Sequence, residues 1–256
     1  MSAERVSLSL LAAVLVTAAA AAVGAPPSAH GAAGGPSVQS MVVGSGGAVL
    51  SQARVVAASA TTLRVEGKSC SVAGGTPLAA LAALRRRGGP GFAVRDYGHC
   101  GSSPRNSAEL FVYSLGGEAN RGQSGWEYKV DHLSGSTGAG DPSGPRGDGR
   151  RVPSGARVLW FWCNASAGGC QRTLDLSPSA TTVSRGSSLT VVVSGYDNEG
   201  RGAPIAGAIV TLGSDFASTD ASGRARLLAP PTPGRYALSC SRPGLVPSFP
   251  ETIAVR

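Results

Sequence analysis

The chain has 256 residues, of which 42% are hydrophobic and only 5% aromatic, and it contains 37 glycines and 17 prolines. This composition supports a packed core but argues against long helices, because so much glycine and proline favours short strands and turns. The formal net charge is +8, yet the only run of basic residues is Arg85–Arg87, at the end of a predicted helix. Because a nucleic-acid-binding protein usually concentrates its charge on one element, we expect no nucleic-acid partner. The run either complements the helix dipole or attracts an acidic polymer such as a cell-wall polyanion.

Residues 1–33 have the pattern of a secretory signal peptide. Arg5 precedes an apolar run, Leu8–Val23, which small residues follow. At about 16 residues the run is short for a membrane span, so we expect cleavage between Ala25 and Ala33. An uncleaved anchor is the alternative. We therefore expect a secreted or cell-surface protein with no transmembrane segment after cleavage.

The next part of the chain predicts strands and one helix. Residues 34–60 are rich in small residues with weak alternation, and form either a first strand or an ordered lead-in or linker. Alternating apolar positions predict a strand and turn over 61–72. The sequence then predicts a helix over 76–87, because Thr76 is a favourable N-cap, Gly88 suits the residue after the helix, and the leucines between them share one face.

Four further strands are predicted after this helix, over 92–98, 109–116, 126–132 and 157–163. One helix crossing such a sheet is typical of an α+β fold. The composition changes near residue 173, after which short alternating runs recur about every ten residues between turns. This spacing predicts an all-β sandwich from residue 174 to residue 256.

The strand Arg157–Cys163, with sequence RVLWFWC, has two apolar faces. Its alternation places three side chains on each face: Val158, Trp160 and Trp162 on one, and Leu159, Phe161 and Cys163 on the other. A strand that is apolar on both faces is expected at the centre of a sheet.

We expect Leu159 and Phe161 to pack under the helix, which leaves the tryptophans on the second side of the sheet. There they are either covered by the long loop after residue 132 and by Trp126, or part of a recognition surface. The candidate ligand surface comprises Trp126, Tyr128, Trp160 and Trp162. Exposed aromatic pairs of this kind stack well on sugars or planar ligands.

The usual patterns of catalytic and metal sites do not occur. The triplet Gly67–Ser69 lacks the earlier glycine of a phosphate-binding loop, and no G-x-S-x-G pentapeptide is present. His132 and Asp131 are adjacent in a strand and so point in opposite directions. The spacing of Cys163 and Cys170 fits neither a zinc site nor a C-x-x-C redox motif. We therefore expect no enzyme activity, no metal and no cofactor.

The part from 61 to 173 resembles the transcobalamin-like C-terminal domain family of bacterial exported proteins. The matching segments are GTPLAALAAL, GWEYKV (Gly125–Val130), GAGDPSG and GARVLWFWC. The resemblance implies a β-grasp-like fold, with a mostly antiparallel sheet and one helix, like the small domain of vitamin B12 carriers. In those carriers a large helical barrel supplies most of the binding surface, so the resemblance alone does not imply a corrinoid ligand.

The part from 174 to 256 resembles immunoglobulin-like and carboxypeptidase-regulatory-like modules. The segments that carry the resemblance are PIAGAIVTLGS (204–214), STDASGRARLLAP (218–230) and GRYALSCSRPG (234–244), with the turn at Asp220–Gly223. Modules of this kind are non-catalytic spacers or adhesion units.

The five cysteines predict two disulfides in an exported protein. Cys70 and Cys100 bracket the helix and would close a loop of about 30 residues, for which chain entropy gives roughly 3.5 kcal/mol. Cys163 and Cys170 would close a loop of about seven residues for roughly 2.5 kcal/mol, at the exit of the central strand. Cys240 remains as a buried free thiol.

These features together predict a non-catalytic exported protein that binds or displays at the cell surface, with the β-sandwich as stalk or adhesion module. The partner would be an extracellular ligand, with cell-wall polymers and glycans as candidates. The alternative is a receptor for a corrinoid-like small molecule or a glycan, which would use the aromatic strand face.

Overall fold

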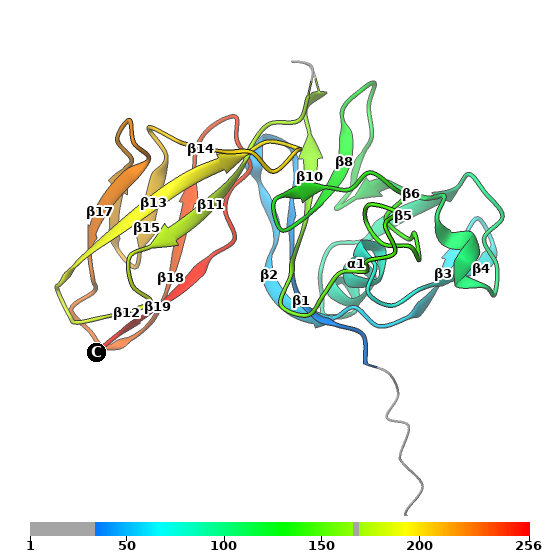
Figure 1. Cartoon of the computed structure of the whole chain (residues 1–256), viewed down its shortest axis with the longest axis horizontal. Helices are drawn as coiled ribbons and strands as arrows, with labels where there is room; N and C mark the ends of the chain where they lie inside the picture. Colours follow the sequence, from blue (N-terminus) through cyan, green and yellow to red (C-terminus); the bar gives the residue numbers. More distant parts are fainter. Residues whose placement is uncertain (1–33, 166–168) are drawn as a thin grey trace, which may run out of the picture. The chain divides into compact units, whose positions relative to one another are not determined.

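The computed structural model describes residues 34–165 and 169–256 (Figure 1). The predicted signal peptide, residues 1–33, lies outside the described residues. Within the described ranges, no helix is long and apolar enough to cross a bilayer. We use "first module" for residues 34–173 and "second module" for residues 174–256.

The main sheet of the first module has the strand order β2-β1-β10-β8-β9. Its central pair, β1 (Ser37–Val43) and β10 (Arg157–Cys163), is parallel, whereas β2 (Val49–Ala57) and β8 (Gly125–Val130) lie antiparallel on either side. The short β9 (Leu133–Ser134) pairs with β8 at the edge. The tryptophan-containing strand is therefore central, as its two apolar faces predict.

Residues 34–60 form part of this sheet rather than a linker ahead of it. They supply β1 and β2, which are joined through a short 3-10 turn, η1 (Ser45–Gly47). The second half of β1 is buried on both faces, so its sequence shows an apolar run instead of a clear alternation. The first module thus begins before residue 61, the boundary that the family resemblance implies.

The helix α1 (Pro77–Arg86) packs on one face of the main sheet. Its first turn is capped by Thr76, whose Oγ1 accepts a hydrogen bond from the Ala79 N–H at 3.2 Å. All side chains from Pro77 to Leu84 are buried. The leucines of the helix share a hydrophobic core with Val158, Trp160 and Trp162 of β10.

This packing corrects the expected orientation of β10. Leu159 and Phe161 do not lie under the helix; they form a separate core cluster with Val246 and Phe249 of the second module. Because both faces of the strand are apolar, alternation separates the two sets of side chains but does not say which set the helix covers.

Two smaller sheets complete the first module. The hairpin of β3 (Thr61–Val65) and β4 (Lys68–Val72) forms one, and the strands β5 (Phe92–Asp96), β6 (Leu110–Leu115) and β7 (Glu118–Ala119) form the other. A second 3-10 turn, η2 (Pro104–Ser107), lies between β5 and β6.

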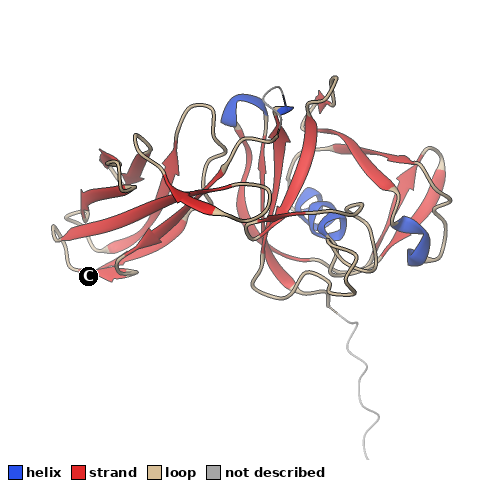
Figure 2. Ribbon diagram, turned by 45° about the horizontal axis from the view of Figure 1, so that its top comes forward, coloured by secondary structure: helices blue, strands red, loops and turns tan. Residues whose placement is uncertain are grey.

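The second module is a β-sandwich of two sheets (Figure 2). One sheet contains β11 (Thr173–Pro178), β13 (Ser188–Tyr196), β14 (Gly202–Pro204) and β17 (Arg224–Leu228). The other contains β12 (Thr182–Val183), β19 (Glu251–Val255), β18 (Gly234–Ser241), β15 (Ile209–Leu212) and β16 (Asp215–Ser218). Alternate side chains of both sheets meet in one hydrophobic core, as the regular spacing of short strands predicts.

The two modules belong to one unit of the chain, and polar contacts join them. The Arg157 guanidinium on β10 donates to Asp175 at 3.0 Å and also to the Glu251 carboxylate. Lys129 on β8 is fully buried, and its ammonium donates to the carbonyl oxygens of Tyr196 and Asp197 at 3.0 and 2.7 Å.

Candidate functional site

The four aromatic side chains proposed as a ligand surface are buried. The exposed fraction lies between 1% and 6% for each of Trp126, Tyr128, Trp160 and Trp162. Trp126 and Trp162 pack edge to face with ring centroids 5.7 Å apart, and the rings of Tyr128 and Trp160 lie 5.5 Å apart. The prediction of an exposed recognition surface on these residues is therefore wrong. The tryptophans are covered by Trp126 and the long loop, as the alternative expects, but also by α1, which was expected on the other face.

Hydrogen bonds to covering segments fix two of these rings. The Trp126 indole N–H donates to the Glu118 carbonyl oxygen at 2.8 Å, and the Tyr128 hydroxyl donates to the Thr137 carbonyl oxygen at 2.9 Å. Burial raises the pKa of Tyr128 to about 12. Both rings therefore satisfy their polar atoms within the fold, as buried tryptophan and tyrosine usually do.

A cavity of about 320 Å³ nevertheless lies beside this cluster. Trp126, Tyr128 and Trp160 form one side of it, and the segment 135–139 contributes to another. Among the described residues, the buried indole Nε1 of Trp160 has no hydrogen-bond acceptor.

The cysteines form two disulfides, Cys70–Cys100 and Cys163–Cys170. The first joins β4 to the loop after β5. The second joins the last residue of β10 to Cys170. Cys240 on β18 is a buried free thiol, and burial raises its pKa to about 11. Since the thiolate is the reactive form, Cys240 is almost entirely protonated and inert at neutral pH.

The acidic, histidine and cysteine side chains do not gather into a metal-binding set in the described ranges. No group of three or more histidine, cysteine, aspartate or glutamate side chains there is arranged to hold a metal ion. His132 stacks on Tyr196 with a centroid distance of 3.7 Å, and its Nε2 lies 3.8 Å from Asp175 rather than against Asp131.

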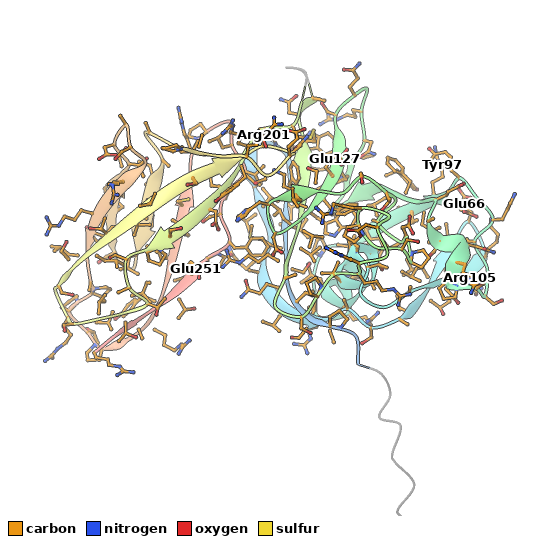
Figure 3. All side chains as sticks on the ribbon, viewed as in Figure 1. Glu66, Tyr97, Arg105, Glu127, Arg201 and Glu251 are labelled. Carbon is orange, nitrogen blue, oxygen red and sulfur yellow. A yellow bond between two sulfur atoms is a disulfide. The ribbon has the colours of Figure 1, made fainter. Side chains whose placement is uncertain are left out.

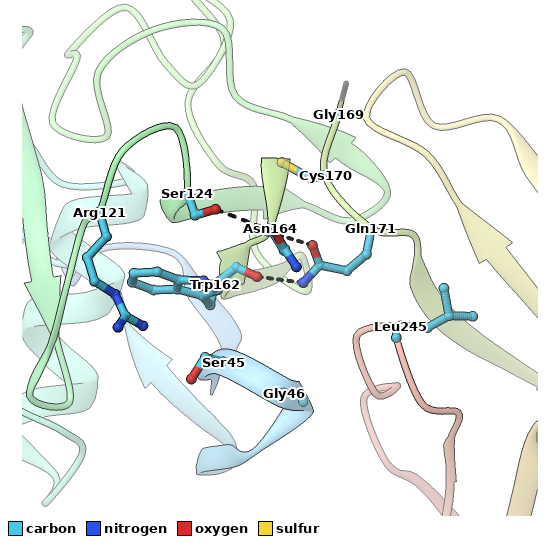
Figure 4. A pocket seen from close by; sticks show the side chains of 12 residues that line it. Ser45, Gly46, Arg121, Ser124, Trp162, Asn164, Gly169, Cys170, Gln171 and Leu245 are labelled. Carbon is cyan, nitrogen blue, oxygen red and sulfur yellow. Dashed lines mark hydrogen bonds between the residues drawn. The ribbon is translucent and has the colours of Figure 1, made fainter. Parts of the chain in front are cut away.

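A polar hollow of about 680 Å³ lies beside the end of β10 (Figure 4). Gln171 donates to the Trp162 carbonyl oxygen at 2.6 Å and accepts from the Asn164 N–H at 2.9 Å, so it links the chain after the second disulfide to the end of β10. The Arg121 guanidinium lies 5.4 Å from the Trp162 ring, and it is the only charged group among the described residues that line the hollow. Most of its polar side chains thus have structural partners.

The exposed aromatic face of the first module lies instead on β5 and β6. We define the β5–β6 face by Arg95, Tyr97, Phe111 and Tyr113. Tyr97, which is labelled in Figure 3, is 63% exposed. Phe111 is 41% exposed, and the centroids of the two rings lie 5.9 Å apart. The Arg95 guanidinium lies 5.1 Å from the Tyr113 ring.

Strand alternation explains why this face is open. Leu110 and Val112 are buried, so Phe111 and Tyr113 of the same strand point away from the core. Arg95 on β5 is paired with Phe111 across the sheet and points the same way. The sequence predicts both strands, and their alternation shows which side chains share a face. The alternation does not show which face of such a small sheet stays uncovered.

An open groove of about 610 Å³ adjoins the β5–β6 face. Three arginines from different elements line it: Arg64 of β3, Arg85 of α1 and Arg95 of β5. Tyr113 and the single carboxylate Glu66 complete its polar lining, and the Arg95 Nε lies 4.0 Å from Glu66 Oε1. The groove therefore combines an aromatic ring with an excess of positive charge.

Comparisons with known proteins leave the family open. No family model matches the chain, and no curated protein matches it. Among solved structures, the chain is similar to the D00-D0 domain of Intimin, with 15% sequence identity and a TM-score of 0.25 over 57% of this chain and 89% of that one. A TM-score this low does not establish a shared fold, so the β-sandwich assignment rests on the strands described above.

Proposed function

We propose that the protein is a non-catalytic exported protein whose first module binds an extracellular ligand on the β5–β6 face. The β-sandwich then serves as the stalk or adhesion module. The observation that carries the proposal is the open pair Tyr97 and Phe111, next to Arg95 and Tyr113, in a module that buries the aromatic rings of its main sheet.

The chemistry of this face favours binding. Adjacent exposed rings offer flat apolar area to a sugar ring or another planar group, and aromatic residues are enriched where proteins recognise ligands. Arg95 adds a hydrogen-bond donor and a charge at the edge of the same surface. The two disulfides and the predicted signal peptide support an extracellular location.

The strand order supports the finer fold assignment. A central parallel pair, β1 and β10, with antiparallel neighbours and one helix across a face is the arrangement expected of a β-grasp-like domain. The two-sheet organisation of the second module supports an immunoglobulin-like sandwich. We propose both assignments on this basis.

Retention on insoluble glycans tests the proposal. The full mature chain would be incubated with peptidoglycan, chitin and cellulose, beside the variant Tyr97→Ala/Phe111→Ala and the control Phe216→Ala. Phe216 is 70% exposed on β16, so the control removes a similar ring from the other module. We expect at least about tenfold weaker retention for the double variant only. Absence of retention on every glycan, or equal retention of both variants, would refute the proposal.

A second candidate function is a small-molecule receptor at the 320 Å³ cavity, because the rings of Trp126, Tyr128 and Trp160 line it. A volume at the lower end of the range for ligand pockets suits a compact planar ligand. A thermal-shift screen of small planar compounds tests this candidate, with Trp160→Phe as the variant that reduces the aromatic lining. Stabilisation that is equal in both proteins, or absent, would exclude the candidate.

A further inference from the structure

We infer that the groove between the β3–β4 hairpin and the β5–β6 face binds an acidic polysaccharide, whose carboxylate or sulfate groups contact Arg64, Arg85 and Arg95. The inference rests on the proposed function and deepens it, because Arg95 and Tyr113 belong both to the groove and to the β5–β6 face.

The charge in the groove is largely uncompensated. Glu66 is the only acidic residue of its lining, and among the described ion pairs it contacts Arg95 alone, at 4.0 Å. Arg64 donates to the Ser69 hydroxyl at 3.2 Å, and Arg85 donates to the Gly89 carbonyl oxygen at 3.1 Å. Since both partners are neutral, they orient the guanidinium groups without cancelling their charge.

The elements that carry these arginines are held in place by the core of the module. Arg85 lies in the last turn of α1, one residue after Leu84, which is fully buried. Arg64 lies on the hairpin that the Cys70–Cys100 disulfide joins to the loop after β5. A ligand therefore meets charges whose backbone positions are already fixed, which lowers the entropic cost of binding.

The positive surface continues beyond the groove along the end of α1. Arg86 donates to the Thr61 hydroxyl at 3.2 Å, Arg87 donates to the Val55 carbonyl oxygen at 3.4 Å, and Arg54 donates to the Arg87 carbonyl oxygen. None of these three arginines forms an ion pair with a described residue. A polymer could thus extend from the groove across a run of exposed arginines.

The charge is also concentrated in one module. Residues 34–173 contain 15 basic and 8 acidic residues, for a net charge of +7, whereas residues 174–256 contain 7 basic and 6 acidic residues, for a net charge of +1. A net positive charge on one module attracts an extended polyanion and raises its association rate.

An acidic glycan fits these features better than a nucleic acid does. A pyranose ring presents an apolar face that can stack on Tyr113 or Phe111, while its acidic substituents reach the arginines. The predicted signal peptide also directs the protein to the compartment where acidic polysaccharides occur. A nucleic acid also carries negative charge and rings that stack on aromatic side chains, so the test includes a nucleic acid as a competing ligand.

Isothermal titration of the full mature chain tests the inference with four polymers: polygalacturonate, dextran sulfate, neutral dextran and single-stranded DNA. The variant is Arg64→Gln/Arg85→Gln/Arg95→Gln. The matched control is Arg185→Gln/Arg235→Gln/Arg242→Gln, which removes three exposed arginines of the second module. We expect polygalacturonate or dextran sulfate to bind, and which of the two binds distinguishes recognition of carboxylates from recognition of sulfates. Neutral dextran and DNA should bind at least about tenfold more weakly.

The groove variant should weaken binding of the acidic glycan by at least about tenfold, and the control by less than about twofold. Equal binding of neutral dextran, tightest binding of DNA, or equal loss in the two variants would overturn the inference. If only the acidic polymers fail while retention on a neutral glycan still depends on Tyr97 and Phe111, the proposed function stands and this inference is wrong. If no glycan binds in either experiment, both are wrong.

Discussion

The buried Lys129 should make the stability of the protein depend on pH in a defined window. Its side chain is fully buried, and its ammonium donates to the Thr173 hydroxyl at 3.2 Å and to the carbonyl oxygens of Tyr196 and Asp197. Loss of hydration on burial lowers the pKa of Lys129 to about 8, although Asp197 and Glu199 favour the charged form.

The sign and size of the effect follow from this shift. An unfolded lysine has a pKa near 10.5, so between about pH 8 and 10.5 the unfolded chain binds a proton that the folded chain has lost. The free energy of unfolding therefore rises with pH across this window, by about 3 kcal/mol in total. Below pH 8 the lysine is charged in both states and contributes no pH dependence.

The assay compares urea unfolding from pH 7.5 to 10.5 for two proteins, both carrying Cys240→Ala to prevent thiol–disulfide exchange. One keeps Lys129 and the other carries Lys129→Met. Tyr128, whose raised pKa makes stability fall above about pH 10, is present in both and cancels in the difference. The stability of the lysine protein relative to the methionine protein should rise by about 3 kcal/mol with pH. A difference that stays constant would refute the burial of this ammonium.

The remaining predictions concern the cysteines and the helix cap. Non-reducing peptide mapping should recover both disulfides of the structure, and a bridge from Cys240 to any other cysteine would contradict it. Iodoacetamide at pH 8 should modify Cys240 only after denaturation, since burial holds its pKa near 11; rapid labelling of the folded chain would show that the thiol is accessible. Thr76→Ala should lower the free energy of unfolding by about 1 kcal/mol in urea melts, while Thr76→Ser, which keeps the capping oxygen, should lose less. Equal losses would show that the hydroxyl does not cap the helix.

Local chemistry in the sequence is enough to predict the helix and the central strand. The cap at Thr76 and the spacing of the leucines predict a helix over 76–87, and the structure has Pro77–Arg86. Apolar residues on both faces of 157–163 predict a central strand, and β10 lies at the centre of the main sheet. Each inference depends on neighbours within a few positions of the chain.

Features that depend on distant pairing could not be predicted in the same way. The strand β1 pairs with β10, more than a hundred residues away, and its small, doubly buried side chains give no alternation to detect. Trp160 is covered by other segments of the chain, so the sequence of the strand alone does not predict whether its side chain is exposed. The groove could not be predicted from the sequence, because its arginines come from β3, α1 and β5, which only the tertiary fold brings together.

The most direct test of the central claim is a residue-by-residue map of binding on the folded protein. The ¹⁵N-labelled mature chain would be titrated with short oligogalacturonates, and the amide chemical shifts followed. The β5–β6 face and the groove predict that the largest changes fall in 92–97 and 110–115, with smaller changes near Arg64 and Arg85. Changes confined to 135–139 beside the Trp160 cavity, or to the second module, would contradict the claim.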